Sequence, residues 1–156
     1  ATSGVWSSTT PTSSIISISN DTGINGSGNT ILAYCFTDIK GYHKTGRYHG
    51  NGNADGTFVF TGFRPALIMV RDPGNAENWL VYDNKRPGYN LNNNHMMWNS
   101  NTAETASSAN TMDILSNGFK VRSSNNGLNR NGAHFMYMAW AESPFVNSNN
   151  VPTNAR

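Results

Sequence analysis

Apolar residues along this chain come in short runs bounded by Gly, Asn, Asp or Pro, and almost none continues for the length of a helix. Several runs alternate between apolar and polar residues, which is typical of strands that bury one face. The pattern predicts about nine short strands: 15–19, 30–37, 44–50, 56–61, 66–71, 79–83, 95–98, 119–123 and 134–141. Short strands at this turn-separated spacing indicate a β-sandwich or barrel. We therefore expect an all-β fold, a single jelly-roll-like β-sandwich with long polar loops.

The length of 156 residues is that of one domain with a full core, so one sandwich over residues 1–156 is the expected organisation. The Asn/Gly-rich stretch 50–56 separates two strands and predicts a hairpin connection. Residues 103–115 are rich in Ser, Thr and Asn, so we expect a loop there with at most a turn or two of helix. The longest stretch without a firm strand is 85–110, and long loops on a β scaffold commonly carry binding sites.

Two segments separated by 104 residues resemble each other. When residues 23–38 are aligned with 127–142, Gly, Asn and Gly coincide, and each segment continues into an apolar strand with an aromatic residue and an acid near its end. Two upstream pairs align if one loop residue is skipped: Ile16 with Phe119, and Ile18 with Val121. Either two Asn/Gly hairpins look alike by chance, or residues 1–40 are or mimic the closing hairpin of a preceding repeat. The second alternative predicts a tandem or longer polypeptide.

Only 13% of the residues are charged and the net charge is +2, with no basic run longer than the pair Lys85 and Arg86. Because phosphate contacts need clustered Lys and Arg, we expect no nucleic-acid partner. No apolar stretch reaches the length of about 18 residues that a membrane span needs, so we expect none. The single cysteine, Cys35, excludes an internal disulfide, and its apolar neighbours predict burial as a small hydrophobe.

One loop imitates the start of a calcium-binding loop. Asn51, Asn53 and Asp55 place oxygen ligands at alternate positions and are followed by a glycine. Val59 and Gly62 stand where the ninth ligand and the bidentate acid would be needed, so the second half of the motif fails. We interpret the stretch as an Asn/Asp/Gly hairpin turn, keep calcium as the alternative, and expect no cofactor.

The sequence contains no pattern that is specific for catalysis. It has nine acids, and most of them occur in turn contexts such as Asp55-Gly56, where a turn role is sufficient. His43 and His49 are six residues apart and could share a face of one strand, but no Cys or acid cluster accompanies them as a zinc site would require. We expect a protein that is not an enzyme. Carboxylates from distant strands can still meet, so a polysaccharide-degrading enzyme stays as an alternative.

Aromatic and amide side chains gather in the region 84–101, which is rich in asparagine. A flat aromatic ring beside amides suits a sugar, because the ring covers C–H faces while the amides bond hydroxyl groups. The same surface would suit a wet protein interface, and Asn-rich loops also occur simply as solvated loops. The candidate ligand-binding residues are Trp79, Tyr89, Asn92, Asn93, His95 and Trp98.

Several groups of residues, spread over 30–156, resemble a known family. They include Ala33-Tyr34-Cys35-Phe36, Gly46-x-Tyr48-x-Gly50-Asn51-Gly52-x-x-Asp55-Gly56, Thr61-Gly62-Phe63-Arg64-Pro65-Ala66, Leu115-Ser116-Asn117-Gly118-Phe119 and Ala139-Trp140-Ala141-Glu142-Ser143-Pro144-Phe145. The sequence resembles domains of structural proteins of tailed bacteriophages, marine phages among them. These domains typically occur in or near tail-fibre or other virion proteins, with concanavalin-like partners.

The resemblance implies a β-sandwich-like fold and a structural role in the virion, and it brings no catalytic residues. We accordingly expect a fibre, tip or decoration protein at the particle surface that acts in assembly, in host attachment or in both. Its expected partners are its own copies, other virion proteins and a host-surface glycan. The low charge and the apolar residues Met96, Met97 and Phe145 near strand ends favour a homo-oligomer. A lectin-like carbohydrate-binding module is the main alternative.

Overall fold

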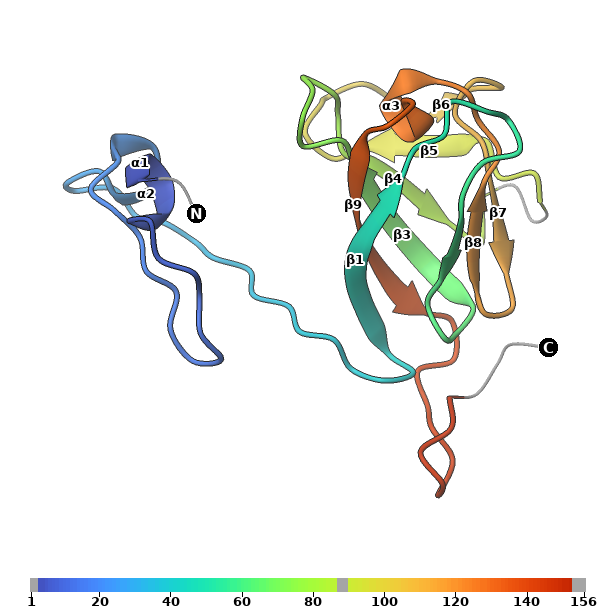
Figure 1. Cartoon of the computed structure of the whole chain (residues 1–156), viewed down its shortest axis with the longest axis horizontal. Coiled ribbons are helices and arrows are strands. Elements are labelled where there is room, and N and C mark those ends of the chain that lie inside the picture. Colours follow the sequence, from blue (N-terminus) through green and yellow to red (C-terminus); the bar gives the residue numbers. More distant parts are fainter. Residues whose placement is uncertain (1–2, 87–89, 153–156) are drawn as a thin grey trace. The chain divides into compact units, whose positions relative to one another are not determined.

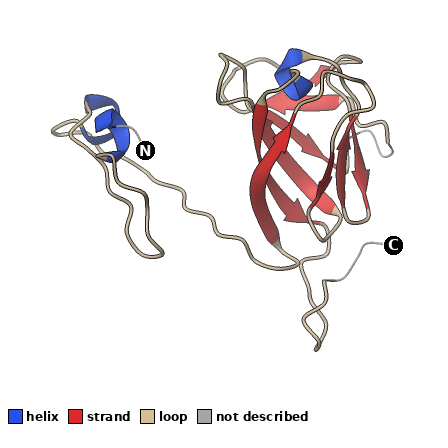
Figure 2. Cartoon of the chain, in the orientation of Figure 1, coloured by secondary structure: helices blue, strands red, loops and turns tan. Residues whose placement is uncertain are grey.

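The computed structural model describes residues 3–86 and 90–152. The chain forms two compact units, Ala1–Phe36 and Thr37–Arg156. The second unit contains every strand found in the described residues, arranged as two antiparallel sheets (Figures 1 and 2). The order in the larger sheet is β1-β9-β3-β4-β5-β6 and in the smaller one β2-β8-β7. The sandwich thus begins after the first unit rather than extending over the whole of residues 1–156.

The strands are short and separated by polar turns, as the apolar pattern predicts. Their bounds are β1 His43–His49, β2 Phe58–Phe60, β3 Pro65–Arg71, β4 Leu80–Asp83, β5 Asn94–Met97, β6 Thr105–Ala106, β7 Met112–Leu115, β8 Gly118–Val121 and β9 His134–Ala141. The three helices of the described chain have four residues each: α1 Ser3–Trp6, α2 Thr22–Asn25 and α3 Asn126–Asn129. Among the described residues no helix is long and apolar enough to cross a membrane.

The strand β9 holds the larger sheet together because it pairs with two neighbours. It lies antiparallel to β1, with His134 opposite His49 and Trp140 opposite His43, and antiparallel to β3 on its other edge. Its alternating sequence turns Phe135, Tyr137 and Ala139 into the core.

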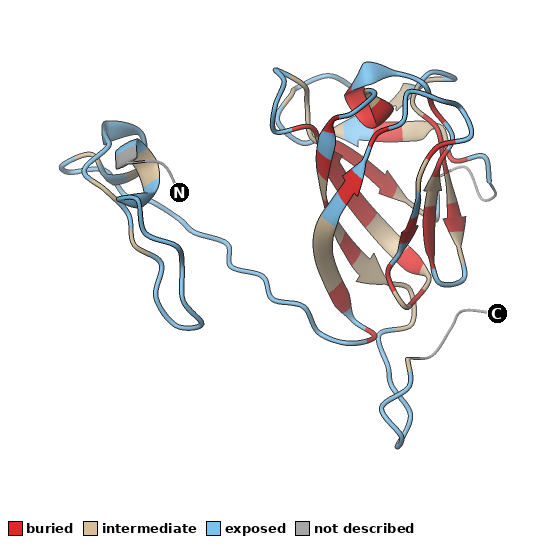
Figure 3. Ribbon diagram, viewed as in Figure 1, coloured by how far each residue is buried: buried red, intermediate tan, exposed pale blue. Residues whose placement is uncertain are grey.

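The core lies between the two sheets, where buried residues from both inner faces meet (Figure 3). Tyr48 shows the contact: its ring stacks on Phe135 at 5.0 Å between centroids and meets Phe119 of the smaller sheet edge-on at 6.1 Å. Its hydroxyl donates to the carbonyl of Leu128 at 2.7 Å, so the buried phenol keeps a hydrogen bond. The predicted all-β sandwich is confirmed.

Seven of the nine predicted strands correspond to observed ones, and the exceptions have a common cause. Residues 15–19 and 30–37 form no strand, although their apolar patterns predict one. The segment 103–115, predicted as a loop, instead contains β6 and β7, which pair with β5 and β8. A strand needs a neighbouring strand for its backbone hydrogen bonds. Residues 15–19 and 30–37 have no such neighbour, whereas β6 and β7 do, so the presence of a partner strand decided the outcome rather than local composition.

The first unit exposes apolar side chains that a folded core would bury. Leu32 and Tyr34 are 73% and 76% exposed in an extended stretch without strand pairing, and Ile31 is 51% exposed. Cys35 is also exposed, so its predicted burial is wrong. The physical reason is the same as for the missing strand: in this structure no second sheet covers the segment.

Candidate functional site

The Asn-rich region 84–101 is in part a structural element. Asn92 is buried and its side-chain Nδ2 donates to the carbonyl of Asp83 at 2.6 Å. Its backbone forms an isolated antiparallel bridge with Met112, through hydrogen bonds of 2.8 and 2.9 Å. Asn92 therefore fastens the loop between β4 and β5 to the smaller sheet, and its amide does not face a ligand at the surface.

His95 likewise faces the interior, from the middle of β5. Only 1% of it is exposed, and its ring lies 5.6 Å from the ring of Tyr82 between centroids. Burial lowers the pKa of His95 below its usual 6.5, while a hydrogen bond with the Asn93 backbone opposes that shift. A buried imidazole is a core residue, so His95 does not belong to an exposed binding surface.

The other predicted ligand-binding residues are distributed around the β4–β5 end of the larger sheet. Asn93 is half-buried, and its carbonyl accepts from the backbone of Ser107 at 3.0 Å. Trp98 is 65% exposed, and its backbone N–H donates to the carbonyl of Trp79 at 3.1 Å. Tyr89 lies outside the described residues. The structure thus keeps the two tryptophans near each other, whereas Asn92 and His95 are buried.

Trp79 borders a shallow depression of about 310 Å³. Its other lining residues come from β1 and β9: Thr45, Gly46, Arg47, Met136, Tyr137 and Met138. The guanidinium of Arg71 lies 5.8 Å from the Trp79 ring centroid, which restrains the indole by a cation–π contact. A Cβ at Gly46 would stand 2.7 Å from the Tyr137 ring, so glycine is needed there for the ring to pack. A depression lined by aromatic, arginine and methionine side chains can accept a flat ligand.

The loop that imitates the start of a calcium-binding loop has its oxygens occupied by protein donors. Asn51 Oδ1 accepts from the backbone of Asn53 at 3.0 Å and from Asn129 Nδ2 at 2.8 Å, and Asn53 Oδ1 accepts from the backbone of Asp55 at 2.9 Å. Asp55 contacts Lys120 at 2.6 Å, and this hydrogen bond lowers the pKa of the carboxyl group. The loop is stabilised by its own side chains and by Asn129. Because it joins β1 of the larger sheet to β2 of the smaller sheet, and these two strands do not pair, the predicted hairpin connection over 50–56 is wrong. In the described part of the chain no three His, Cys, Asp or Glu residues gather as a metal site would require.

The carboxylates serve as structural acceptors. All nine acids of the sequence lie in described residues, and each meets a hydrogen-bond donor or a basic side chain: Asp21, Asp38, Asp55, Asp72, Glu77, Asp83, Glu104, Asp113 and Glu142. Asp72 is buried and receives two hydrogen bonds from Arg130, at 2.8 and 2.6 Å. Burial raises the pKa of Asp83, but donors from Lys85 and Arg86 outweigh it and lower the pKa overall. These carboxylates are engaged in holding loops and strands.

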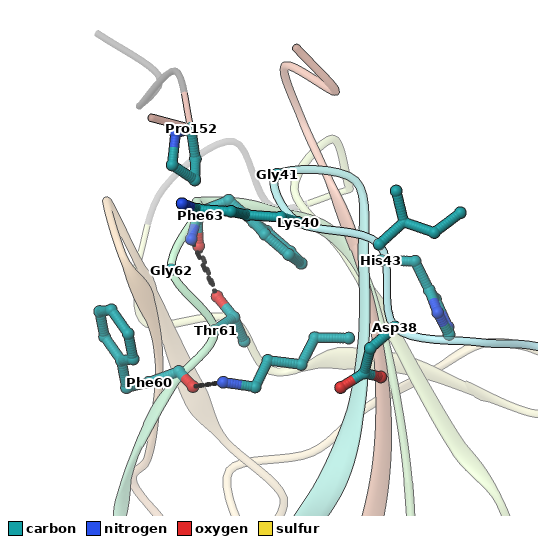
Figure 4. Close-up of a pocket in the computed structure, with 11 residues that line it drawn as sticks. Asp38, Lys40, Gly41, His43, Phe60, Thr61, Gly62, Phe63 and Pro152 are labelled. Atoms are coloured by element: carbon teal, nitrogen blue, oxygen red, sulfur yellow. Dashed lines mark hydrogen bonds between the residues drawn. The ribbon is translucent and has the colours of Figure 1, made fainter. Parts of the chain in front are cut away.

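A second cavity, of about 500 Å³, opens where β1 begins (Figure 4). The loop before β1, the turn between β2 and β3, and Pro152 line it. Lys44 is one of the lining residues and donates to the carbonyl of Phe60 at 3.2 Å, with its ammonium 5.5 Å from the Phe60 ring. His43 packs its ring against Trp140 at 4.9 Å. The lining is mostly apolar with two lysines, and the carboxylate of Asp38 is bound to Thr45.

His43 and His49, considered as a pair of zinc ligands, stand at opposite ends of β1. Six residues of extended strand span roughly 20 Å, so the two rings cannot share one metal ion. His49 instead lies beside His134 of β9, with ring centroids 4.1 Å apart. The cross-strand neighbour was determined by the pairing of β1 with β9, which local spacing does not reveal.

A family model described as "Domain of unknown function (DUF7483)" matches residues 1–144. The chain belongs to this family. The match includes the first unit and continues past the end of β9 in the second. No curated protein and no solved structure matches this DUF7483 chain.

Sequence reasoning missed both depressions of this DUF7483 domain, apart from Trp79. Each is lined by residues from segments far apart in the chain, such as Arg47 and Met136, or Lys44 and Pro152. The cross-strand pair Arg47 and Met136 is set by strand register. The alternating pattern of β1 and β9 could have identified outward-facing positions, but the register between the strands is a tertiary property.

Proposed function

We propose that this DUF7483 protein is a non-enzymatic structural module of a bacteriophage particle. In this proposal it acts at the virion surface as a fibre, tip or decoration protein, associates with its own copies and other virion proteins, and contributes to assembly. The observation that carries the proposal is the exposed apolar segment around Leu32 and Tyr34. Contiguous exposed apolar surface of this kind marks a protein interaction site.

The charge distribution of the segment supports an assembly role. Residues 22–37 contain no charged side chain, so no ionic desolvation cost opposes burial against another protein surface. Met96 and Phe145, which the sequence had marked as interface residues, are also exposed, whereas Met97 is half-buried against the core. The engagement of all nine carboxylates by donors or basic side chains supports the non-enzymatic part of the proposal.

The assignment to a phage particle rests on the sequence resemblance described above. Its test is the composition of the particle: antibodies raised against the purified protein should label intact virions of a phage that encodes it. Mass spectrometry of purified virions should find the protein in fixed stoichiometry with the major structural proteins. Absence from purified virions would contradict the assignment, whatever the protein does in isolation.

The assembly role has a test of its own, by light scattering of the purified full chain. The wild type is expected to self-associate as concentration rises, and the Leu32→Ser/Tyr34→Ser variant should shift to monomer. A matched control removes two exposed apolar side chains elsewhere, Phe58→Ser with Val151→Ser, and should associate as the wild type does. A wild-type chain that stays monomeric at high concentration argues against assembly through this segment.

A second candidate function, host-glycan binding, is favoured by the depression beside Trp79. Its aromatic wall is the type of surface that covers the apolar face of a sugar ring. On a glycan array the wild type should bind a surface polysaccharide, and Trp79→Ala should abolish the signal without loss of folding. Trp6→Ala is the matched control, since it removes a partly exposed tryptophan from the other unit. An array without hits would remove this candidate.

A further inference from the structure

The first unit repeats the local structure of the segment that closes the sandwich. The helices α2 and α3 are each four residues long and start 104 residues apart. Their N-caps, Asp21 and Asn125, accept a hydrogen bond from the backbone of Gly23 and Gly127 respectively, both at 2.8 Å. Because the spacing of 104 holds for both helix and cap, the resemblance seen in the sequence is a resemblance in three dimensions.

The correspondence continues on both sides of the helix. Ser19 and Ser123 each accept from the backbone two residues later, at 3.1 and 2.9 Å. Beyond the helix, Gly28 and Gly132 both adopt a left-handed backbone, with φ of +78° and +71°. The next residue donates to the backbone three positions earlier, at 3.1 Å in both segments. Asn/Gly loops that were alike only by chance would not share this whole set.

The correspondence extends upstream with a spacing of 105. The hydroxyl of Ser19 donates to the carbonyl of Gly4, and the hydroxyl of Ser123 donates to the carbonyl of Ala109. The spacing between the two segments therefore changes between Gly4 and Ser19, where Ile16 and Ile18 align with Phe119 and Val121 at a spacing of 103. Residues 19–29 thus share the local hydrogen bonds and backbone conformation of residues 123–133, and the contact of Ser19 with Gly4 matches that of Ser123 with Ala109.

The two copies differ in what surrounds them. Asn129 is fully buried, and besides its bond to Ser123 its amide donates to Asn51 Oδ1 and the Asn53 carbonyl, both at 2.8 Å, and accepts from the Asn51 backbone. Asn25 at the equivalent position is exposed and makes the bond to Ser19, at 3.0 Å, which is internal to its own segment. The side chain of Asn129 thus holds the β1–β2 loop in the sandwich, whereas the equivalent side chain of Asn25 is exposed to solvent in the first unit.

The strand that follows shows the same contrast. Phe135 and Ala139 of β9 are fully buried between β1 and β3, whereas the equivalent Ile31 and Cys35 are exposed. Residues 30–37 carry no charge and have an apolar side chain at nearly every position, which suits a strand with both faces covered. In this chain the equivalent gap between β1 and β3 is already filled by β9.

We infer that residues 4–38 are the closing segment of a second DUF7483 sandwich, whose remaining strands precede them in the same polypeptide. The order of elements supports a tandem arrangement, because the closing segment is followed directly by β1 of the next sandwich. Residues 30–37 insert between the β1 and β3 equivalents of that preceding sandwich, and Asn25 fastens its β1–β2 loop. The inference competes with the proposed assembly role for this segment, because residues 30–37 that close a preceding sandwich are not available for association between copies, and the light-scattering test and the fusion below distinguish the two.

The side chains also indicate how the preceding sandwich differs. Ile31 and Ala33 stand where β9 has Phe135 and Tyr137, so the inserted strand fills less volume. A close-packed core requires bulkier residues opposite these two positions. The preceding repeat therefore has a sequence distinct from this one in its core.

A fusion to residues 1–156 tests the inference. A second copy of residues 37–105 is joined before the first residue, so that residues 1–38 are positioned to close it. A companion fusion carries Ile31→Phe and Ala33→Tyr, which restore the side chains of β9 for a copy of this particular sequence. A control fusion carries a second copy of residues 37–142, complete with its own β9, and shows that an added sandwich folds in this position.

The readout is the reactivity of Cys35, the only cysteine of the chain. In the unfused protein and the control fusion it should react with a thiol reagent at the rate of an exposed thiol. In the test fusions it should react roughly tenfold or more slowly, because it would occupy the buried position of Ala139. Hydrogen exchange of residues 30–37 should slow in parallel. Protection in either test fusion supports the inference, and protection in neither overturns it.

Discussion

The side chain of Asn129 connects several elements of the fold through hydrogen bonds. With its amide it joins α3 to the loop between β1 and β2, through two hydrogen bonds to Asn51 and one to Asn53. The loop in turn orders Asp55, which pairs with Lys120 of β8. A single buried amide thus connects both sheets through the turn that had resembled a calcium loop.

Replacing Asn129 should therefore be costly, since Asn129→Ala leaves several buried partners without a hydrogen bond. We expect the free energy of unfolding to fall by about 3 kcal/mol. The matched control is Asn25→Ala, at the equivalent exposed position, which should change stability by less than about 0.5 kcal/mol. Urea denaturation of both variants measures the difference. Equal effects of the two substitutions would contradict the role assigned to Asn129.

His95 should make stability depend on pH. Burial lowers its folded-state pKa below the unfolded value of 6.5, so below that pH the unfolded chain binds more protons. The stability is fully present above pH 6.5 and is lost progressively as the pH falls toward the lower folded-state pKa. Denaturation curves between pH 5 and pH 7 should show the loss for the wild type and for the control His134→Asn. His95→Phe should remove it, and an unchanged pH dependence in that variant would refute the assignment.

At the scale of elements, β9 is the central member of the sandwich. It is bonded on both edges and contributes Phe135, whose ring stacks on Tyr48 of β1. The equivalent stretch 30–37 has a comparable apolar pattern, yet it forms no strand here. The difference lies in the partners, because a strand is stabilised by cross-strand contacts more than by its own sequence.

Phe135→Ala and Ile31→Ala should consequently differ strongly. Removal of the buried ring of Phe135 should destabilise the sandwich by about 3–5 kcal/mol, through lost burial and the cavity left behind. Ile31→Ala, in the exposed copy, should cost less than about 0.5 kcal/mol. Thermal unfolding followed by tryptophan fluorescence and circular dichroism would measure both. A large effect of Ile31→Ala would mean that the first unit is part of the cooperative fold.

For the molecule as a whole, two units with different protection are expected. Amides in β3, β8 and β9 are bonded within sheets around a common core, whereas residues 29–38 are extended and exposed. Local opening is easiest where few buried contacts and few internal hydrogen bonds exist.

Hydrogen exchange followed by mass spectrometry should show this difference directly. At concentrations where the chain is monomeric, peptides covering 29–38 should exchange within seconds, and peptides from 134–141 should remain protected until global unfolding. In the test fusions described above, protection should move into 30–37. Slow exchange at 29–38 in the unfused chain would indicate a partner already bound there, such as a second copy.

The alternation of apolar and polar residues and the turn residues between runs were sufficient to predict an all-β sandwich and seven of its strands. These features are local: side-chain period and the backbone preferences of Gly and Asn act over a few residues. The repeat at a spacing of 104 was visible for the same reason, since both copies carry the same Asn/Gly signals.

Only the tertiary structure decided which of the predicted strands form. Residues 30–37 and β9 share a pattern, but only β9 has strands on both sides. The same holds for side chains: Asn92 and His95 looked like surface groups until packing buried them, and Trp79 became part of a depression through residues of β1 and β9. Burial and strand pairing depend on contacts between segments that are far apart in the chain. The sequence of one segment therefore does not reveal which segment it contacts.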